Sequence, residues 1–409
     1  MRDSRFQKGL FWFIVGVNFL NYLDRYTLPA VLEPLGRDLG LTDGERGWLG
    51  SAFLLSYMIA APIFGVLGDR FSRPRLISIA IAGWSLATAA TWLVRSFGTL
   101  VALRAAVGVG EAAYYGLGVA MLCDLVPERE RAGKLTWFFL AIPLGSAIGF
   151  GLAGFIAQHA GWRASFLVCG LPGLAVAAAM WRLRDPERGR NDLVADATRD
   201  LGFGARLRFL LTHRIWVVTT LCYVGYTFAM GALTHWSASF LERVHGVSTG
   251  DAGLTFGAMA AVTGIAGTLA GGALTQRLSA RWPRFDVAFS SATLCLSIAG
   301  VAGYLLSPSL PMALAALAFG MLLLFASTTP VNNLTVTYLP ASIRAWGAAI
   351  NVFFIHLLGD AVSPEVVGAI SDHGGATAAS LRGALLVTLP ALAFAGLVLL
   401  LARRPLSRS

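Results

Sequence analysis

Residues 10–33 read LFWFIVGVNFLNYLDRYTLPAVLE, and this stretch decides the class of fold. The run is about long enough, at roughly 1.5 Å of rise per residue, to cross a bilayer core of about 30 Å as a helix. Its middle nevertheless holds Asn18, Asn21, Asp24 and Arg25. A charge at the bilayer centre costs roughly 2.5–3.5 kcal/mol, so such side chains face a protein interior or a wet cavity. We expect either a structural ion pair between packed helices or a polar path through which a substrate moves.

The composition of the whole chain indicates a membrane protein. Its 409 residues are 56% hydrophobic and 13% charged, and the mean hydropathy is +0.67. These values exclude an ordinary soluble globular fold and are typical of a chain that crosses the lipid bilayer many times. The net charge of +10 lies in short segments between apolar runs, so it reflects membrane topology and predicts no nucleic-acid partner. The cysteines lie in or beside apolar runs and are expected to be free thiols: Cys123, Cys169, Cys222 and Cys295.

Twelve apolar runs are long enough to span a bilayer as helices. They cover residues 10–32, 47–68, 75–94, 98–123, 135–157, 163–181, 214–240, 251–275, 286–306, 311–338, 345–369 and 378–402. The long polar stretch 182–213 separates the sixth run from the seventh, and we expect it to be a linker. The sequence therefore predicts an all-α membrane protein with an N-terminal six-helix bundle at 1–181 and a C-terminal six-helix bundle at 214–409.

The distribution of Lys and Arg predicts the orientation of these helices. Twenty-four of the 32 basic residues lie at the two termini and in the loops after the even-numbered runs, and six lie in the opposite loops. Loops rich in Lys and Arg stay in the cytoplasm. We therefore expect both termini and the 182–213 linker on the cytoplasmic side of the cell (inner) membrane.

Six plus six helices around a central linker is the layout of the major facilitator superfamily. The segment GVLGDRFSRPR at 65–75 resembles the cytoplasmic loop motif of that superfamily, although Pro74 stands where a basic residue is usual. The resemblance implies a conformational latch made of Gly65, Asp69, Arg70, Arg73 and Asp124. In that latch, Arg70 or Arg73 would reach Asp124. The alternative is that these basic residues only anchor the topology.

The fifth run has small residues at positions that favour tight helix packing. Pro143, Gly145 and Gly149 follow one another within two helical turns. Glycine allows two helix backbones to approach closely, and an internal proline can bend a helix. We expect this helix to lie against another transmembrane helix at these glycines.

The fourth run brings two further charges into the membrane. Arg104 and Glu111 lie two turns apart on one helix face, about 10 Å along the axis, so they cannot easily pair with each other. Asp24 and Arg25 of the first run are the available partners, and the four residues are expected to form one cluster. A buried carboxylate beside arginines can exchange its proton for a rearranged ion pair or a substrate anion. We expect Glu111 to carry the coupled proton, with Asp24 second.

The second half of the chain offers a different set of polar groups. His356 and Asp360 lie one turn apart on one helix face, and the prediction is that they form a hydrogen-bonded pair, with Asp360 a further candidate proton carrier. Aliphatic residues, Phe353, Phe354 and Trp236 are expected to accommodate an apolar tail. The full set of predicted substrate-binding residues is Arg25, Arg104, Asn21, Tyr22, Tyr115, Tyr226, Trp236, Asn332, Asn333, Phe353 and His356.

Three strings together resemble one family within the superfamily. NYLDRYT at 21–27, Arg104 with Glu111, and HLLGDAVSP at 356–364 are similar to the spinster transporters of lysolipids and sphingolipids. The resemblance implies an amphipathic substrate like a lysophospholipid or sphingosine-1-phosphate, with protons as the coupling ion. It also suggests a monomer without a cofactor.

Other functions remain as alternatives. The substrate could instead be a drug or an organic anion that is exported with protons, or the chain could be a membrane receptor or scaffold that transports nothing. The sequence has no GxxxxGK[ST] loop, no HExxH, no GxSxG and no Cys/His cluster with metal spacing, so an enzyme or an ATP-driven pump is not expected. Asp24 and Asp360 could form the dyad of an intramembrane hydrolase, but each has a basic neighbour of its own.

Overall fold

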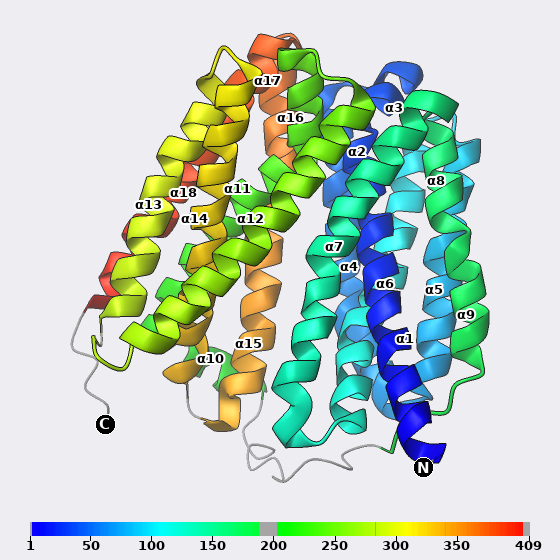
Figure 1. Ribbon diagram of the computed structural model, residues 1–409, viewed down its shortest axis with the longest axis vertical. Helices are drawn as coiled ribbons and strands as arrows, with labels where there is room; N and C mark the ends of the chain where they lie inside the picture. Colours follow the sequence, from blue (N-terminus) through cyan, green and yellow to red (C-terminus); the bar gives the residue numbers. More distant parts are fainter. Residues whose placement is uncertain (1, 188–202, 283, 340, 404–409) are drawn as a thin grey trace. The chain divides into compact units, whose positions relative to one another are not determined.

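The computed structural model describes residues 2–187, 203–282, 284–339 and 341–403, and every regular element in these ranges is a helix (Figure 1). The chain first forms α1 (Arg2–Arg25), α2 (Thr27–Ala30), α3 (Leu32–Leu39), α4 (Asp43–Arg70), α5 (Arg73–Ala90), α6 (Phe97–Leu125), α7 (Glu128–Ala160), α8 (Trp162–Gly170) and α9 (Pro172–Trp181). It continues with α10 (Phe203–Thr212), α11 (Arg214–His245), α12 (Thr249–Leu278), α13 (Phe285–Leu306), α14 (Leu310–Thr337), α15 (Ala341–Ile355), α16 (Ser363–His373), α17 (Ala378–Leu385) and α18 (Thr388–Val398). A π-helical segment η2 (His356–Asp360) joins α15 to α16, and short 3-10 helices lie at Thr91–Leu93 and Leu399–Arg403.

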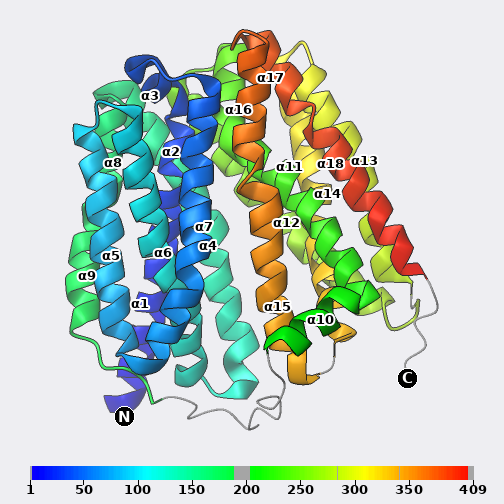
Figure 2. The same ribbon diagram turned by 180° about the vertical axis from the view of Figure 1, so that it is seen from behind.

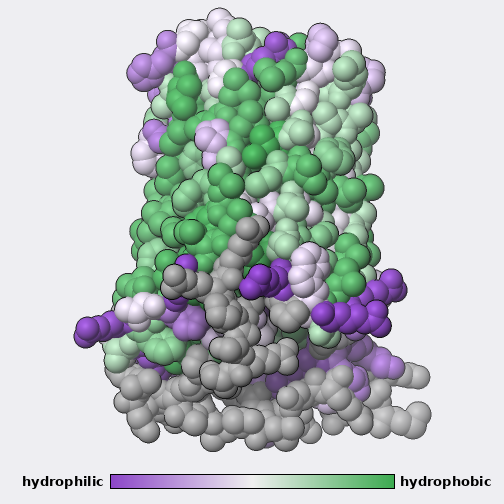
Figure 3. Space-filling model, turned by 90° about the vertical axis from the view of Figure 1, so that its left-hand side faces the viewer, coloured by the Kyte–Doolittle hydropathy of each residue, from purple (hydrophilic) through white to green (hydrophobic). Residues whose placement is uncertain are grey.

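Eleven segments of the described chain are long and apolar enough to cross a membrane. They coincide with the second to the twelfth predicted runs, and three of them join consecutive helices: α8 with α9, α15 with α16, and α17 with α18. The first predicted run corresponds to α1, in which charged and amide side chains interrupt the apolar sequence. Figure 3 shows one face on which hydrophobic residues form a broad band, with hydrophilic residues gathered beyond its two ends, as expected of a surface that meets lipid.

The contacts of the chain divide it into two compact units. The first unit comprises the described residues of 1–194 together with 236–261, and the second comprises those of 195–235 together with 262–409. The end of α11 and the first half of α12 therefore belong with the N-terminal helices by contact, although they follow the predicted linker in sequence. Part of that linker, 188–202, lies outside the described residues, and α10 occupies its last third. Figure 2 shows the helices from the opposite side.

The first predicted span is interrupted where sequence reasoning expected one helix over 10–32. Helix α1 ends at Arg25, and α2 and α3 follow as short separate helices. Pro29 has no backbone N–H to donate to the carbonyl of Arg25, four residues earlier, so the helical ladder breaks at that point. The break places Arg25 in the last turn of α1, where a cation complements the negative end of the helix dipole.

The glycines of α7 bring that helix close to α1. A Cβ atom on Gly145 would lie 2.5 Å from the carbonyl oxygen of Phe19, and one on Gly149 would lie 2.5 Å from that of Leu23. Neither distance is possible for a real side chain, so only glycine permits this contact. Asn18 reinforces it because its side-chain amide donates a 2.7 Å hydrogen bond to the carbonyl of Phe138. The predicted tight packing of the fifth run is therefore present, and α1 is its partner.

Side-chain hydrogen bonds to main-chain carbonyls join the helices of the second unit. Trp216 of α11 donates from Nε1 to Gly347 of α15 at 3.0 Å, and Tyr223 of α11 donates to Thr328 of α14 at 2.7 Å. Both side chains are buried. Each bond satisfies a polar group that would otherwise lie unpaired inside the unit. These contacts hold α11 against the two helices that carry the polar residues predicted for this half.

Candidate functional site

An ion pair joins α1 to α6 in the first unit. Arg25 Nη2 is 2.8 Å from Glu111 Oε2, and Arg25 Nε donates to the same oxygen at 2.9 Å. The Glu111 side chain is 0% exposed and that of Arg25 is 19% exposed. Hydrogen bonds between ionised groups are among the strongest in proteins, which offsets part of the cost of burying both charges. The sequence predicted this partnership from the need of each charge for a counter-charge.

Aromatic rings surround the guanidinium of Arg25. Its central carbon is 4.9 Å from the ring centre of Tyr22, 5.0 Å from that of Phe53 and 5.2 Å from that of Tyr57. Aromatic faces attract cations at such distances without neutralising them. Arg25 therefore keeps a favourable environment even when the carboxylate of Glu111 is protonated. Sequence reasoning named Tyr22 but missed the two rings of α4, because nothing in the sequence of α4 distinguishes them from core residues.

Arg104 differs from Arg25 in lacking a matched acceptor. It is 3% exposed, and its guanidinium carbon is 5.1 Å from the ring centre of Phe53, so this ring serves both arginines. Its Nε has no hydrogen-bond partner among the described residues. A buried N–H without an acceptor is costly, and an anion placed beside it would remove that cost. Arg104 is thus the strongest candidate in the first unit for contact with a negatively charged group.

The position of Phe53 depends on a close approach between α4 and α6. A Cβ atom on Gly108 would lie 2.2 Å from the carbonyl oxygen of Phe53, so only glycine lets the two backbones meet there. Gly108 lies one turn after Arg104 on the same helix. The same glycine therefore allows the helices to touch and brings the Phe53 ring to the arginines.

Asp24 points away from Arg25, although the two residues are adjacent in sequence. It is 1% exposed, and its Oδ2 accepts a 2.8 Å hydrogen bond from the hydroxyl of Thr88 in α5. Its Oδ1 has no hydrogen-bond partner among the described residues. Among the residues that the structure describes, the expected four-charge cluster thus contains one direct ion pair, and Asp24 and Arg104 are buried beside it without one. Thr88 was missed because a single threonine in an apolar helix carries no distinguishing pattern.

Arg73, the first residue of α5, binds two carboxylates beside the end of α4. The charge distribution predicts that this end of α4 lies on the cytoplasmic side. Arg73 Nη1 is 2.6 Å from Asp124 Oδ2, and its Nε is 2.8 Å from Asp185 Oδ1. The Arg73 side chain is buried, whereas Asp69 and Arg70 are exposed. Arg73, one of the two arginines expected to reach Asp124, is in contact with it. Whether this contact acts as a latch stays a prediction.

A second network joins the end of α11 to α3 and α4 within the first unit. Arg243 Nε donates to Glu33 at 2.6 Å, and its two terminal nitrogens donate to Asp43 at 2.7 and 2.6 Å. Arg46 Nη1 lies 3.3 Å from an oxygen of each of these carboxylates. Sequence reasoning counted Arg46 and Arg243 only as markers of topology, since hydropathy does not tell which loop charges are buried.

The residues predicted in the second unit lie on α11, α14 and the α15–η2–α16 segment. His356 Nδ1 is 2.9 Å from Asp360, and both side chains are partly exposed. The π-helical turn that holds them packs closely on α11, because a Cβ atom on Gly231 would lie 2.5 Å from the Cβ of Asp360. Asn333 donates to Asp286 at 2.7 Å.

The remaining predicted substrate contacts differ widely in exposure. Asn332, Phe353 and Tyr115 are exposed, whereas Tyr226 and Asn21 are buried. Trp236 is fully buried, and its contacts place it in the first unit. A buried side chain can shape a site without touching the substrate directly. The exposed ones remain free to make that contact.

Comparison with known proteins gives the family. The family model of the Major Facilitator Superfamily matches residues 14–364. The chain is 32% identical over 377 residues to protein spinster homolog 3 of Danio rerio, with 87% of this chain and 75% of that protein covered. It is also 32% identical over 376 residues to sphingosine-1-phosphate transporter SPNS2 of Mus musculus, with 87% and 68% covered.

A solved structure agrees with these matches. The crystal structure of a bacterial homolog to the human lysosomal transporter spinster, in an inward-facing and unoccupied conformation, aligns with a TM-score of 0.88 at 23% identity over 97% of both chains. At that identity the likeness speaks for the fold, and it confirms the all-helical major facilitator fold predicted from the apolar runs. The chain therefore belongs to the spinster family of major facilitator superfamily transporters.

Proposed function

We propose that the protein is a proton-coupled secondary transporter of an amphipathic anion like a lysophospholipid or sphingosine-1-phosphate. The observation that carries this proposal is the buried guanidinium of Arg104, whose Nε has no hydrogen-bond partner among the described residues. It lies against the same Phe53 ring as Arg25, so a phosphate group there would meet two cations. The similarity to the mouse protein named sphingosine-1-phosphate transporter SPNS2 supports the same class of substrate.

The charges of the site link the anion to a proton. Asp24, Arg25, Arg104 and Glu111 carry no net charge when all four are ionised. A bound anion would leave this buried site negative, and a proton on Glu111 would restore neutrality. Protonation also breaks the ion pair and frees Arg25 for the headgroup. Anion and proton therefore favour each other's binding, which suits their transport in the same direction. Asp24 and Asp360 are the further candidate proton carriers.

The test is transport into proteoliposomes with and without an imposed pH gradient. We expect Glu111→Gln to bind lysophosphatidate or sphingosine-1-phosphate while its transport no longer depends on the gradient. Arg104→Ala should lose binding, because the headgroup loses its donor. Arg95→Ala, in which an exposed arginine is replaced, is the matched control and should behave like the wild type. The proposal fails if Glu111→Gln, Asp24→Asn and Asp360→Asn all keep the pH dependence of the wild type, or if no such lipid binds.

We also propose that the bundles at 1–181 and 214–409 move against each other around the 182–213 linker, with both termini in the cytoplasm. The excess of Lys and Arg in the loops on that side supports this orientation. Labelling of single cysteines placed in the linker tests it with a reagent that does not cross membranes. Reaction from the outside of intact cells would overturn the orientation.

A further inference from the structure

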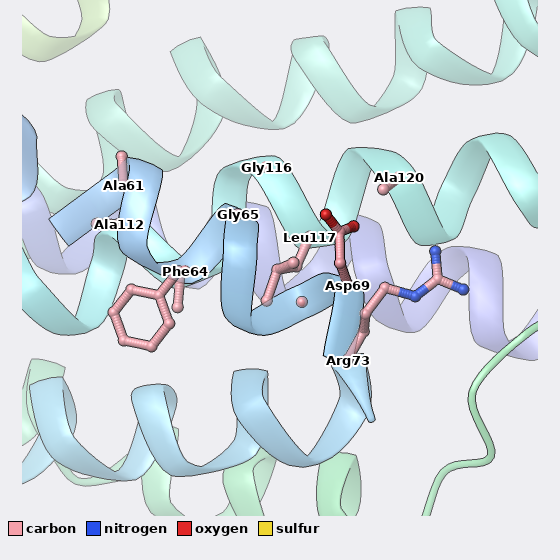
Figure 4. Close-up of a pocket in the computed structure, with 11 residues that line it drawn as sticks. Ala61, Phe64, Gly65, Asp69, Arg73, Ala112, Gly116, Leu117 and Ala120 are labelled. Atoms are coloured by element: carbon pink, nitrogen blue, oxygen red, sulfur yellow. The ribbon is translucent and has the colours of Figure 1, made fainter. Parts of the chain in front are cut away.

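The structure contains a cavity that the charged site does not use. It lies between α4 and α6, has a volume of about 360 Å³ and is lined by eleven residues, seven of which are glycine or alanine. Figure 4 shows it between Ala61 and Phe64 at one end and Asp69 and Arg73 at the other. A space with such walls is an apolar groove that closes on charged groups.

The groove lies further along the face of α4 that also carries the aromatic rings of the charged site. Phe53 and Tyr57 of this helix lie beside Arg25, and Ala61, Phe64 and Gly68 line the groove. These five residues are spaced by three or four positions, so they form a single stripe on the helix. A molecule whose head lies at the arginines would therefore meet the groove one helical turn further along α4.

The walls of the groove leave open space where side chains could be. A Cβ atom added to Gly116 of α6 or to Gly65 of α4 would meet no atom within 4 Å. The lining of α6 extends from Ala112 to Ala120, a distance of about 12 Å along the helix axis. An extended alkyl chain with C–C bonds of about 1.5 Å advances roughly 1.3 Å per carbon, so about ten carbons match this length.

We propose that this groove holds the alkyl tail of the transported amphiphile and limits its length. This inference rests on the proposed function, because the unpaired Nε of Arg104 supplies the headgroup end of the same molecule. The tail would run along α4 from Tyr57 to the far end of the groove. There the charged side chains of Asp69 and Arg73 disfavour further methylene groups. The groove thus sets the preferred number of carbons.

The experiment measures binding of n-alkyl phosphates of six to eighteen carbons to the purified protein by isothermal titration calorimetry. The path along α4 from Tyr57 to Asp69 is about 18 Å, which corresponds to roughly fourteen carbons. For the wild type we expect the affinity to rise by up to about fourfold per added methylene and to level off near this length. Gly116→Leu fills the middle of the groove, whereas Ala120→Leu fills its far end. The two positions are four residues, or about 6 Å, apart along the helix. The affinity of Gly116→Leu should therefore level off at a chain roughly five carbons shorter than that of Ala120→Leu.

Gly83→Leu is the matched control, because it places the same side chain at an exposed helical glycine of α5 with open space around it. It should keep the wild-type dependence on chain length. The groove assignment is overturned if the affinity of Gly116→Leu levels off at the same chain length as that of the wild type. It is also overturned if the substitution lowers the affinity for every alkyl phosphate by the same factor. Failure of the proposed function has a different signature, because Arg104→Ala would then bind hexyl phosphate as tightly as the wild type does.

Discussion

Replacement of Arg243 by glutamine removes the cation that holds the ends of α3, α4 and α11 together. Arg243 donates three hydrogen bonds of 2.6 to 2.7 Å, one to Glu33 and two to Asp43. The side chains of these acids are 5% and 2% exposed, so water cannot replace the lost donors. The variant therefore leaves two buried carboxylates, beside which the guanidinium of Arg46 still lies.

The expected loss of stability follows from this geometry. Removing one partner of a buried ion pair costs about 3–5 kcal/mol, because the other charge stays buried. Arg46 remains 3.3 Å from both acids and offsets part of that loss. We therefore expect Arg243→Gln to lower the free energy of unfolding by about 3 kcal/mol, at the lower end of that range. Adding Asp43→Asn removes the excess negative charge and should recover part of the loss.

The assay is equilibrium unfolding of the purified protein in lipid–detergent micelles. Arg163→Gln is the matched control, since Arg163 also pairs with an acid, Asp38, but with side chains that are 32% and 47% exposed. Exposed pairs contribute about 0–1 kcal/mol, so the control should unfold nearly like the wild type. Equal losses in the two variants would refute the reasoning, and so would a double variant with Asp43→Asn that is no more stable than Arg243→Gln alone.

Three further predictions concern other parts of the first unit. Gly108→Ala forces a Cβ atom within 2.2 Å of the Phe53 carbonyl and should cost about 1–3 kcal/mol in the same unfolding assay, together with weaker binding of the anionic headgroup. Asp69→Asn should lower transport while expression stays intact, because it weakens the proposed latch and not the binding site. Unchanged transport would contradict the latch hypothesis. Arg163 holds the pKa of Asp38 below its ordinary value through their hydrogen bond. A depressed carboxyl pKa contributes stability that is present at neutral pH and lost as the pH falls through the folded-state pKa. The free energies of unfolding of Arg163→Gln and the wild type should therefore become equal in acid.

Hydropathy and charge were enough to predict the fold and one contact of the site. Apolar runs of spanning length have few alternatives to transmembrane helices, and eleven of them correspond to helices of the described chain. Asp24, Arg25, Arg104 and Glu111 were predicted to form one cluster because each charge within a span needs a partner, and Glu111 does pair with Arg25. The break after Arg25 could also have been predicted, since Pro29 stands four residues later and cannot donate to its carbonyl.

Other parts of the site depend on distances that no sequence pattern encodes. The bond from Thr88 to Asp24 links α1 to α5, and hydroxyl groups in apolar helices usually bond to their own backbone instead. The partners of Arg243 are 200 or more residues away in sequence. Charge counting placed such residues in loops correctly, but it gave no indication of which ones fold back into contact.

Glu111, and not the ring of Phe53, distinguishes the two arginines of the site. Both guanidinium groups lie about equally far from the ring, at 5.0 and 5.1 Å, so it stabilises the two cations to a similar extent. The difference between them comes from Glu111, which neutralises Arg25 and leaves Arg104 with an unpaired N–H. Under the proposed function, the headgroup binds the unpaired N–H of Arg104, and Arg25 becomes available to it only when Glu111 takes up a proton. Under the proposed mechanism, this dependence makes the proton a condition for full headgroup binding.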